Sequence, residues 1–378
     1  MTLPPLSLYI HIPWCVRKCP YCDFNSHESH QEIPEQAYLD VLKQDLALDI
    51  AFIQGRKIQS IFFGGGTPSL MSGAFYRELI EHLSINLDFA HDIEITMEAN
   101  PGTTEAGRFA VYREAGINRL SLGVQSFRDE QLKALGRIHS AKQASAAIVQ
   151  AKQAGFDNFN IDLMHGLPGQ GAEQAMEDLQ AAFDLNPTHI SWYQLTIEAN
   201  TEFYSKPPIL PDEDVMWEIQ EAGERLLAAN GYRQYEVSAY AQAQCQSRHN
   251  LNYWCFGDYI GLGAGAHSKV SVADSGHILR YRKSRLPKDY MKARITHRVA
   301  EEAVLVEDLP FEFLMNALRL TEGVEERLYS QRTGLPLASL EPKLSYLRKQ
   351  GLLLQNRLQL TEKGRRFLNS VLEHFVES

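Results

Sequence analysis

The chain has 378 residues, of which 44% are hydrophobic and 22% are charged, so its composition excludes a disordered protein. A formal charge of −10 argues against a general nucleic-acid binder, because phosphate binding favours a basic surface. No apolar run approaches the roughly 20 residues of a membrane span, and the N-terminus lacks the basic start of a secretory signal. An odd count of five cysteines does not indicate a disulfide framework, so we expect a cytoplasmic protein.

Strand-like and helix-like segments alternate through the first half of the chain. Short segments rich in Ile, Leu, Phe and Val predict buried parallel strands at 7–12, 59–63, 93–98, 119–123, 158–163 and 189–196. Helical patterns lie between them at 35–53, 72–86, 104–115, 141–154 and 171–185. Six successive βα units predict a parallel sheet with right-handed crossovers. They are too few for a closed eight-stranded barrel, so we expect a partial (β/α)6 barrel or an open doubly wound sheet.

The pattern changes after about residue 205. The proline-rich "KPPILPDED" precedes a predicted helix at 212–229 and a segment rich in Gly, Tyr and Trp. From about residue 309, three helical patterns, a short "LLLQ…LQLT" hairpin and a last helix predict a winged-helix-like α+β module. We therefore divide the chain into a core of residues 1–205, a connector of residues 206–300 that packs on the core, and a C-terminal domain of residues 301–378.

A basic run lies in the second of these regions. It consists of Arg280, Arg282, Lys283, Arg285, Lys288, Lys292, Arg294 and Arg298, with Asp289 as its one acid. Such a run is usually a solvated face. A patch for carboxylates, or a surface for peripheral membrane association, is the alternative interpretation.

Polar side chains and glycines gather where the predicted strands end. The successive ends carry His11, then Gly64 to Pro68, then Glu98 and Asn100, Gln125, Asn160 with Asp162, and finally Gln194 with Thr196. In parallel α/β sheets, ligands bind at the carboxyl ends of the strands. One polar residue at a strand end is usually structural, but six ends together predict a single site.

Three of the five cysteines occupy eight positions after the first strand, with the spacing C-x3-C-x2-C: Cys15, Cys19 and Cys22. Structural zinc normally takes four ligands, so His11 or His27 would have to complete a zinc site. A thioredoxin-like C-x-x-C pair leaves Cys15 unexplained. Three thiolates on one short loop fit a four-iron cluster in which one iron has no protein ligand and can bind a small chelating molecule.

The glycine triplet Gly64–Gly66 matches neither a dinucleotide fingerprint nor a phosphate loop. It is either a tight turn or backbone exposed for close approach by a ligand. Backbone carbonyls with Glu98 suit an ammonium group, Asp162 and Gln125 suit hydroxyls or amines, and Arg137 suits a carboxylate. An amino acid that carries a ribose would satisfy this set.

The motifs "YIHIPWC…CPYCDF", "GGGTPSLM", "EANPG", "LSLGVQSF", "LGRIH" and "NIDLMHGLPGQ" resemble the radical S-adenosylmethionine (SAM) superfamily, in its coproporphyrinogen dehydrogenase-like branch. The resemblance covers nearly the whole chain. It implies that the three cysteines hold a [4Fe-4S] cluster, which an electron donor reduces and which SAM chelates. The residues it assigns to SAM are Tyr9, Tyr21, Gly65, Gly66, Thr67, Glu98, Gln125, Arg137 and Asp162. Some members bind a second SAM, so these residues need not all contact one molecule.

Two features separate the members of that branch. The dehydrogenases have a further cysteine two residues after the third, where this chain has Phe24, and a longer segment ahead of the first strand. The second feature is "HNLNYW", residues 249–254, which is typical of the haem-chaperone members. His249 would offer an imidazole to haem iron, and Tyr253 and Trp254 would offer flat apolar faces. His267 competes as the iron ligand, and a buried His-Asn pair with a Tyr-Trp core is the purely structural alternative.

The resemblance therefore implies a haem chaperone that transfers haem to respiratory or other haem proteins, with no nucleic-acid partner. Its status as an enzyme stays open. The alternatives are an oxygen-independent coproporphyrinogen III dehydrogenase, which decarboxylates propionate side chains, and a plain zinc-binding α/β domain. A homodimer is a further open prediction.

Overall fold

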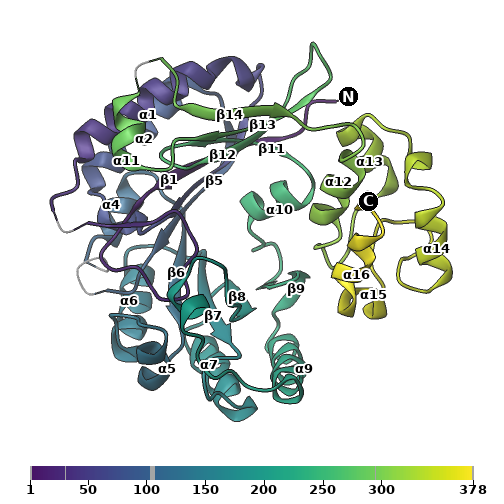
Figure 1. Ribbon diagram of the computed structural model, residues 1–378. Helices are drawn as coiled ribbons and strands as arrows, with labels where there is room; N and C mark the ends of the chain where they lie inside the picture. The colour runs from purple at the N-terminus through teal and green to yellow at the C-terminus, as the bar shows by residue number, and fades with distance from the viewer. Residues whose placement is uncertain (1, 30, 103–106, 294, 377–378) are drawn as a thin grey trace.

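One open sheet organises the molecule. A computed structural model describes residues 2–29, 31–102, 107–293 and 295–376. Within these residues twelve strands form the sheet, in the order β14-β13-β12-β11-β1-β4-β5-β6-β7-β8-β10-β9. Its seven parallel strands are β1 (Leu6–Ile12), β4 (Ile58–Gly65), β5 (Phe89–Ala99), β6 (Arg119–Gln125), β7 (Phe159–His165), β8 (His189–Gln194) and β11 (Asp258–Leu262). The sheet curves but does not close (Figure 1).

Antiparallel strands extend this sheet at both edges. They are β12 (His267–Ser271), β13 (Ile278–Lys283) and β14 (Arg298–Ala303) on one side, and β10 (Ala239–Ala241) and β9 (Arg233–Glu236) on the other. A separate two-stranded ribbon, β2 (Trp14–Cys15) with β3 (His27–Glu28), brackets the cysteine loop.

Helices cover the convex face of the sheet (Figure 1). They are α1 (Glu35–Asp49), α2 (Gly73–Asn86), α4 (Phe109–Glu114), α5 (Asp129–Ala134), α6 (Ala141–Gln153) and α7 (Ala172–Asp184). Every second residue of a strand points toward them. In β1, Leu6, Leu8, Ile10 and Ile12 are fully buried in this core, and each such side chain contributes about 1.5–3 kcal/mol by leaving water.

The alternate positions face the concave side and are mostly polar. They carry Ser7, Tyr9 and His11 in β1, Glu94, Thr96 and Glu98 in β5, Arg119, Ser121 and Gln125 in β6, and Asn160 with Asp162 in β7. A strand period of two therefore separates an apolar helix-facing layer from a polar interior. The chemistry of the chain is concentrated in that interior.

The α/β partial barrel expected from the sequence is confirmed, and its six strands are β1, β4, β5, β6, β7 and β8. The prediction missed β11, which pairs with β1 across about 250 residues of sequence. The expected helix at 104–115 is described only from residue 107, and α4 begins at Phe109. The expected helix at 35–53 ends as an α-helix at Asp49 and continues as a 3-10 turn, Ile50–Ile53.

The second half of the chain adds one helix beside α7 and another on the concave side of the sheet. Helix α9 (Glu213–Ala229) packs beside α7, and α10 (Arg248–Trp254) contacts β1, β4 and β11. Figure 1 shows α10 between the sheet and the C-terminal module. The loop from Thr201 also carries the short α8 (Glu202–Ser205), whose Phe203 amide donates to the Pro20 carbonyl of the cysteine loop at 2.9 Å.

The C-terminal module is a small helical unit with its own core. It contains α12 (Leu309–Ala317), α13 (Glu326–Thr333), α14 (Lys343–Lys349), α15 (Glu362–Arg366) and α16 (Leu368–Glu373). The predicted hairpin is reduced to a single bridge between Leu353 and Leu360. The core of the module also takes in Phe256 and Ile278, with Leu251 and Trp254 of α10 packed against it.

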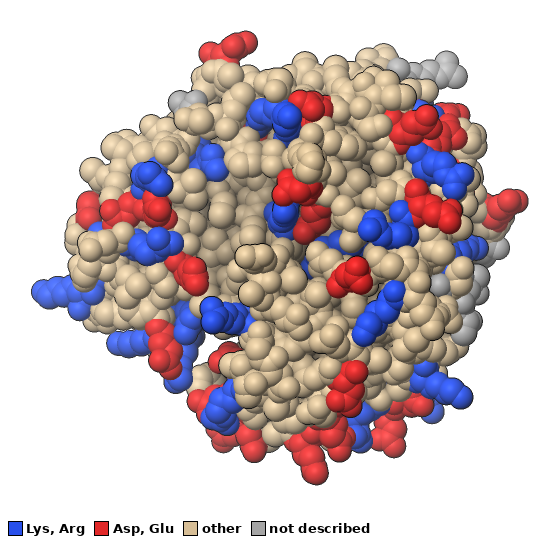
Figure 2. Space-filling view, turned by 180° about the vertical axis from the view of Figure 1, so that it is seen from behind, with Lys and Arg blue, Asp and Glu red and all other residues tan. Residues whose placement is uncertain are grey.

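The interpretation of the basic run as a solvated face holds for Arg282, Arg285, Lys288 and Lys292, which are exposed, whereas its other described members form ion pairs within the fold. Lys283 is buried and pairs with Asp45 and Asp49 of α1. Arg298 also pairs with Asp49, and Arg280 pairs with Glu312 of α12. Arg294 lies outside the described residues. Elsewhere, Lys and Arg side chains are interspersed with Asp and Glu on the face seen in Figure 2. None of the described helices has the length and apolar character needed to cross a membrane.

Candidate functional site

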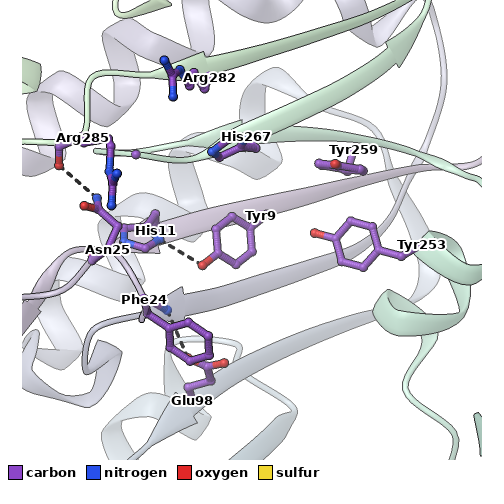
Figure 3. Close-up of a pocket in the computed structure, with 12 residues that line it drawn as sticks. Tyr9, His11, Phe24, Asn25, Glu98, Tyr253, Tyr259, His267, Arg282 and Arg285 are labelled. Atoms are coloured by element: carbon purple, nitrogen blue, oxygen red, sulfur yellow. Dashed lines mark hydrogen bonds between the residues drawn. The ribbon is translucent and has the colours of Figure 1, made fainter. Parts of the chain in front are cut away.

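A cavity of about 600 Å³ opens on the concave side, at the carboxyl ends of β1, β4 and β5. Its lining comes from strands at the middle and at one edge of the sheet, together with the cysteine loop and α10: Tyr9, His11, Phe24, Asn25, Gly65, Glu98, Tyr253, Tyr259, Gly265, His267, Arg282 and Arg285. In Figure 3, Glu98 and Phe24 lie on one side of Tyr9, and His267, Arg282 and Arg285 lie on the other. This volume is within the range of small-molecule and cofactor sites.

The three predicted cluster cysteines lie on one loop beside this cavity. Cys15 is buried, whereas Cys19 and Cys22 are half-buried, and none is in a disulfide. Among the described residues, no group of three or more His, Cys, Asp or Glu is arranged to hold a metal ion, so these thiols do not converge on one point. Burial raises the pKa of Cys15 to about 11 and also raises that of Cys22. Burial therefore favours the neutral thiols, and a bound metal ion would favour their thiolates.

Arg137 links the cysteine loop to the sheet. Its guanidinium donates to the Asn100 side-chain oxygen at 2.6 Å and to the Gly123 carbonyl at 2.7 Å, and its other terminal nitrogen lies 3.6 Å from the sulfur of Cys19. Asn100 in turn donates to the hydroxyl of Thr67 at 3.0 Å. A fixed positive charge beside Cys19 suits a thiolate or an anionic cluster. The donor set thus fits the iron–sulfur cluster by its chemistry.

The glycine triplet is required by packing against the cysteine loop. A side chain at Gly66 would overlap the backbone of Trp14, and one at Gly65 would lie 2.5 Å from the ring of His11. Gly65 also has a φ of +118°, which disfavours other residues. The amides of Gly66 and Thr67 donate to the carbonyls of Ile12 and Trp14, both at 2.7 Å. It is therefore the cysteine loop that packs closely against the glycine backbone. Gly65 also lines the cavity.

Glu98 supplies the acidic wall of the cavity. Its carboxylate accepts the Gly65 amide at 3.1 Å. Burial, followed by the negative charge of Asp162, raises the pKa of Glu98 to about 8. Asp162 is held by the Asn160 amide at 2.7 Å and by the Ser121 hydroxyl at 3.1 Å, and burial raises its pKa as well. Two carboxyl groups with raised pKa values, deep in a polar interior, would bind a cation or an ammonium group.

Gln125 extends this interior at the end of β6. It has a φ of 71°, a backbone conformation that non-glycine residues rarely adopt. Its side-chain oxygen accepts the hydroxyl of Tyr193 at 2.9 Å. The sequence predicts Gln194, the last residue of β8, and Thr196, two residues beyond it, as site residues, but both side chains are exposed and do not join the site. Tyr193 is the inward-facing residue, which the alternation of β8 would have identified.

His11 and Tyr9 are held by hydrogen bonds within the cavity wall. The Nε2 of His11 must donate to the Asn25 carbonyl, 2.8 Å away, so its Nδ1 accepts the Tyr9 hydroxyl at 3.0 Å. Burial lowers the pKa of His11 to about 4, which leaves the ring neutral. With both nitrogens occupied, His11 does not complete a zinc site in this structure. Tyr21 lies away from the cavity, where it packs beside Phe203.

His249 is buried beneath the cavity and does not line it. Only 2% of its surface is exposed, its ring stacks on Phe62 with centroids 5.0 Å apart, and burial lowers its pKa to about 3. Its Nδ1 lies 2.9 Å from the Ser60 hydroxyl and its Nε2 lies 3.0 Å from the Tyr253 hydroxyl. Neither nitrogen is available to haem iron in this conformation. Tyr253 is the residue of "HNLNYW" that reaches the cavity, and Trp254 packs toward the C-terminal module.

Apart from Tyr21, His249 and the cysteines, the predicted residues therefore fall into two groups. Tyr9, Gly65 and Glu98 line the cavity, as do Phe24 and the competing His267. Gly66, Thr67, Gln125, Arg137 and Asp162 form the polar network behind it. Sequence reasoning missed Asn25, Tyr259, Arg282 and Arg285 as cavity residues. Arg282 and Arg285 were present in the basic run, but no sequence signal separated them from their paired neighbours.

Two regions of the chain match known protein families. Residues 9–182 match the radical SAM superfamily, and residues 305–367 match the HemN C-terminal domain. The solved structure of coproporphyrinogen III oxidase (HemN) from Escherichia coli aligns with a TM-score of 0.83 at 24% identity, covering 99% of this chain and 90% of that one. These matches define the class: a radical SAM-type α/β protein with a HemN-like C-terminal domain.

Proteins that match this chain over its full length identify the family within this class. The chain is 53% identical to the heme chaperone HemW of Escherichia coli, with 99% of each chain covered. It is 50% identical to the heme chaperone HemW of Haemophilus influenzae, over 99% of this chain and 98% of that relative. The chain belongs to the HemW family within the radical SAM superfamily.

Proposed function

We propose that this protein is a haem chaperone of the radical SAM type, which binds haem and transfers it to respiratory or other haem proteins. One observation carries the proposal: relatives that match the chain end to end at 53% and 50% identity are named heme chaperones. Phe24 agrees with it, because it stands where the dehydrogenases of the branch have a further cysteine. The Phe24 side chain is 59% exposed at the cavity wall.

In this proposal Cys15, Cys19 and Cys22 hold a [4Fe-4S] cluster, and Arg137 balances its charge from the side of Cys19. SAM would occupy the acidic side of the interior. Glu98 and the backbone of Gly65 and Gly66 would accept hydrogen bonds from its amino group, and Asp162 and Gln125 would take its hydroxyls. Tyr9, Tyr21 and Thr67 would support these contacts. When bound, the cluster and SAM supply one-electron chemistry.

The first test of this function is a haem titration of the anaerobically reconstituted, full-length protein. Haem binding predicts a shift of the Soret band that saturates with added haem. A reconstituted protein with full iron and sulfide content that leaves the haem spectrum unchanged would refute the chaperone function. Cys19→Ser should remove the iron–sulfur absorption, because a cluster needs all three thiolates.

The likeness to coproporphyrinogen III oxidase concerns the fold alone. A dehydrogenase would decarboxylate coproporphyrinogen III under anaerobic, reducing conditions with SAM. We expect no such product from this protein, and its appearance would favour the dehydrogenase function.

We also infer a cytoplasmic location, since all five cysteines are free thiols, and an electron donor for the cluster. Peripheral membrane association and a homodimer stay predictions. Flotation with anionic vesicles tests the first, and light scattering of the purified protein tests the second. The boundaries at residues 205 and 300 are likewise proposals, which limited proteolysis would test.

A further inference from the structure

The wall of the cavity opposite Glu98 is basic and belongs to one hairpin. His267 and Arg282 are direct cross-strand partners on the antiparallel strands β12 and β13, so their side chains share a face. Arg285 follows two residues after β13 ends, and all three line the cavity. Figure 3 shows them together on one side of Tyr9 and His11. The cavity therefore has an acidic wall and a basic wall that suit different ligand groups.

The two arginines of this wall have free charges. Within the described residues, neither Arg282 nor Arg285 forms an ion pair, whereas Arg280, Lys283 and Arg298 of the same run are paired. Both are exposed at the cavity. A guanidinium presents a planar fork that matches a carboxylate. Two guanidinium groups without an ion-pair partner, at one wall of the cavity, therefore suit a ligand that carries two carboxylates.

His267 offers a free imidazole between these charges. The ring makes no hydrogen bond within the described residues. The rings of His11 and His249, in contrast, each make two hydrogen bonds. Desolvation at the cavity wall, followed by the positive charge of Arg282, lowers its pKa. The ring is therefore neutral at neutral pH and has a nitrogen lone pair for a metal.

Aromatic surface completes the wall. Tyr253 and Tyr259 contact each other edge-to-face with centroids 4.6 Å apart, and Phe24 exposes its ring at the cavity. Flat apolar faces of this kind pack against a planar macrocycle. Asn25 ties the wall to the cysteine loop, because its side chain donates to the carbonyls of Arg285 at 2.9 Å and Ala264 at 3.0 Å.

We propose that this basic wall is the haem site: Arg282 and Arg285 bind the two propionate carboxylates, and His267 ligates the iron. The inference rests on the proposed haem-binding function and names the residues that perform it. It assigns the iron to His267 in place of His249. His249 becomes a positioning residue that orients Tyr253 through their hydrogen bond. The ligand class is an iron macrocycle with free carboxylates.

The carboxylate assignment is tested with two probes on full-length, anaerobically reconstituted protein. One is haem, and the other is haem with both propionates esterified. Arg282→Gln with Arg285→Gln should weaken haem binding roughly tenfold to a hundredfold, since each loses a charge-assisted hydrogen bond. It should leave binding of the esterified haem unchanged. Lys288→Gln with Lys292→Gln, two exposed lysines of the same run outside the cavity, is the charge-matched control.

The iron assignment is tested by the absorption spectrum of bound haem. His267→Ala should abolish the signature of histidine ligation, and added imidazole should restore it. His277→Ala, an exposed histidine outside this cavity, is the control. An unchanged spectrum in His267→Ala would overturn this assignment.

The remaining outcomes separate this inference from the function on which it rests. Equal losses for haem and esterified haem, or a loss of SAM affinity instead, would overturn the role of the arginines while haem binding by the wild type stands. A wild type that binds no haem would refute the chaperone function and this site together.

Discussion

Glu98 illustrates how single residues acquire their chemistry in this fold. It occupies an inward position of β5, so the strand period places its carboxyl beside the Gly65 amide and near Asp162. Its raised pKa of about 8 follows from burial and from that neighbouring carboxyl. At neutral pH most of this carboxyl is protonated, and hydrogen bonds donated by a bound amino group would favour the ionised form.

The first prediction concerns the pH dependence of SAM binding. Because the pKa of Glu98 in the free protein lies near 8, binding below that pH requires loss of a proton. The affinity for SAM should therefore rise with pH, by up to about tenfold per pH unit below 8, and level off above it. Glu98→Gln should bind SAM more weakly and with little pH dependence. Calorimetry at pH 6.5, 7.5 and 8.5 measures both effects.

Glu81→Gln, an exposed carboxyl on α2, is the control for this titration and should match the wild type. Equal pH profiles for Glu98→Gln and the wild type would show that another group titrates.

At the scale of elements, the glycine turn and the cysteine loop depend on each other. Gly66→Ala would drive a methyl group into the backbone of Trp14, next to Cys15. We expect a destabilisation of about 1–3 kcal/mol from this overpacking, together with a loss of most of the cluster iron. Iron analysis and thermal unfolding measure the two effects.

Gly171→Ala is the matched control, because a methyl group there meets no atom within 4 Å. A Gly66→Ala protein with full iron content and unchanged stability would contradict the packing described for the turn.

Helix α10 is the second element with a distinct prediction. His249→Ala removes a buried ring and leaves the hydroxyls of Ser60 and Tyr253 without that partner. The free energy of unfolding should fall by about 3 kcal/mol, against about 1 kcal/mol for Tyr253→Phe, as measured by urea denaturation. The spectrum of bound haem should be retained in His249→Ala. Loss of that spectrum without loss of stability would return His249 to the role of iron ligand.

The sequence predicted the elements of the first half well, because each βα unit is local. Strand alternation and helix ends are visible within ten to twenty residues, and the strand-end rule then located the site. The pairing of β1 with β11 was not predictable in this way, since it joins segments about 250 residues apart. For the same reason the hairpin that presents His267 and Arg282 to the cavity could not be placed from sequence.

The roles of individual residues within a motif could not be predicted from the sequence either. "HNLNYW" marks a functional helix, but its pattern does not say which side chain faces the ligand. Three-dimensional packing decides this, because α10 lies against β1 and β4 with His249 turned into the sheet. The basic run is a similar case, since burial of Lys283 among Asp45 and Asp49 cannot be read from charge counts.

At the scale of the whole molecule, the C-terminal module contacts the sheet domain through α10 and through ion pairs to β9 and β13. Trp254 packs against the core of the module, and the guanidinium of Arg319 lies 4.3 Å from its ring while pairing with Glu236 of β9. The same helix supplies Tyr253 to the cavity. Helix α10 therefore contacts both the ligand cavity and the C-terminal module.

Trp254→Ala should loosen this attachment. We expect the C-terminal module to become sensitive to limited proteolysis near residue 304, with a loss of about 3 kcal/mol in stability. Tyr204→Ala, which removes an exposed aromatic ring on α8, is the control. Equal digestion patterns for the Trp254→Ala and wild-type proteins would contradict this attachment.

The proposed function requires the protein both to carry haem and to pass it on. The most direct measurement loads the reconstituted protein with haem under anaerobic conditions, adds a haem-free acceptor cytochrome, and follows the Soret band. We predict a saturable Soret shift on loading and then the appearance of the acceptor's spectrum as haem leaves the protein. A cluster-containing protein that neither shifts the haem spectrum nor yields haem to the acceptor would rule out the haem-chaperone function.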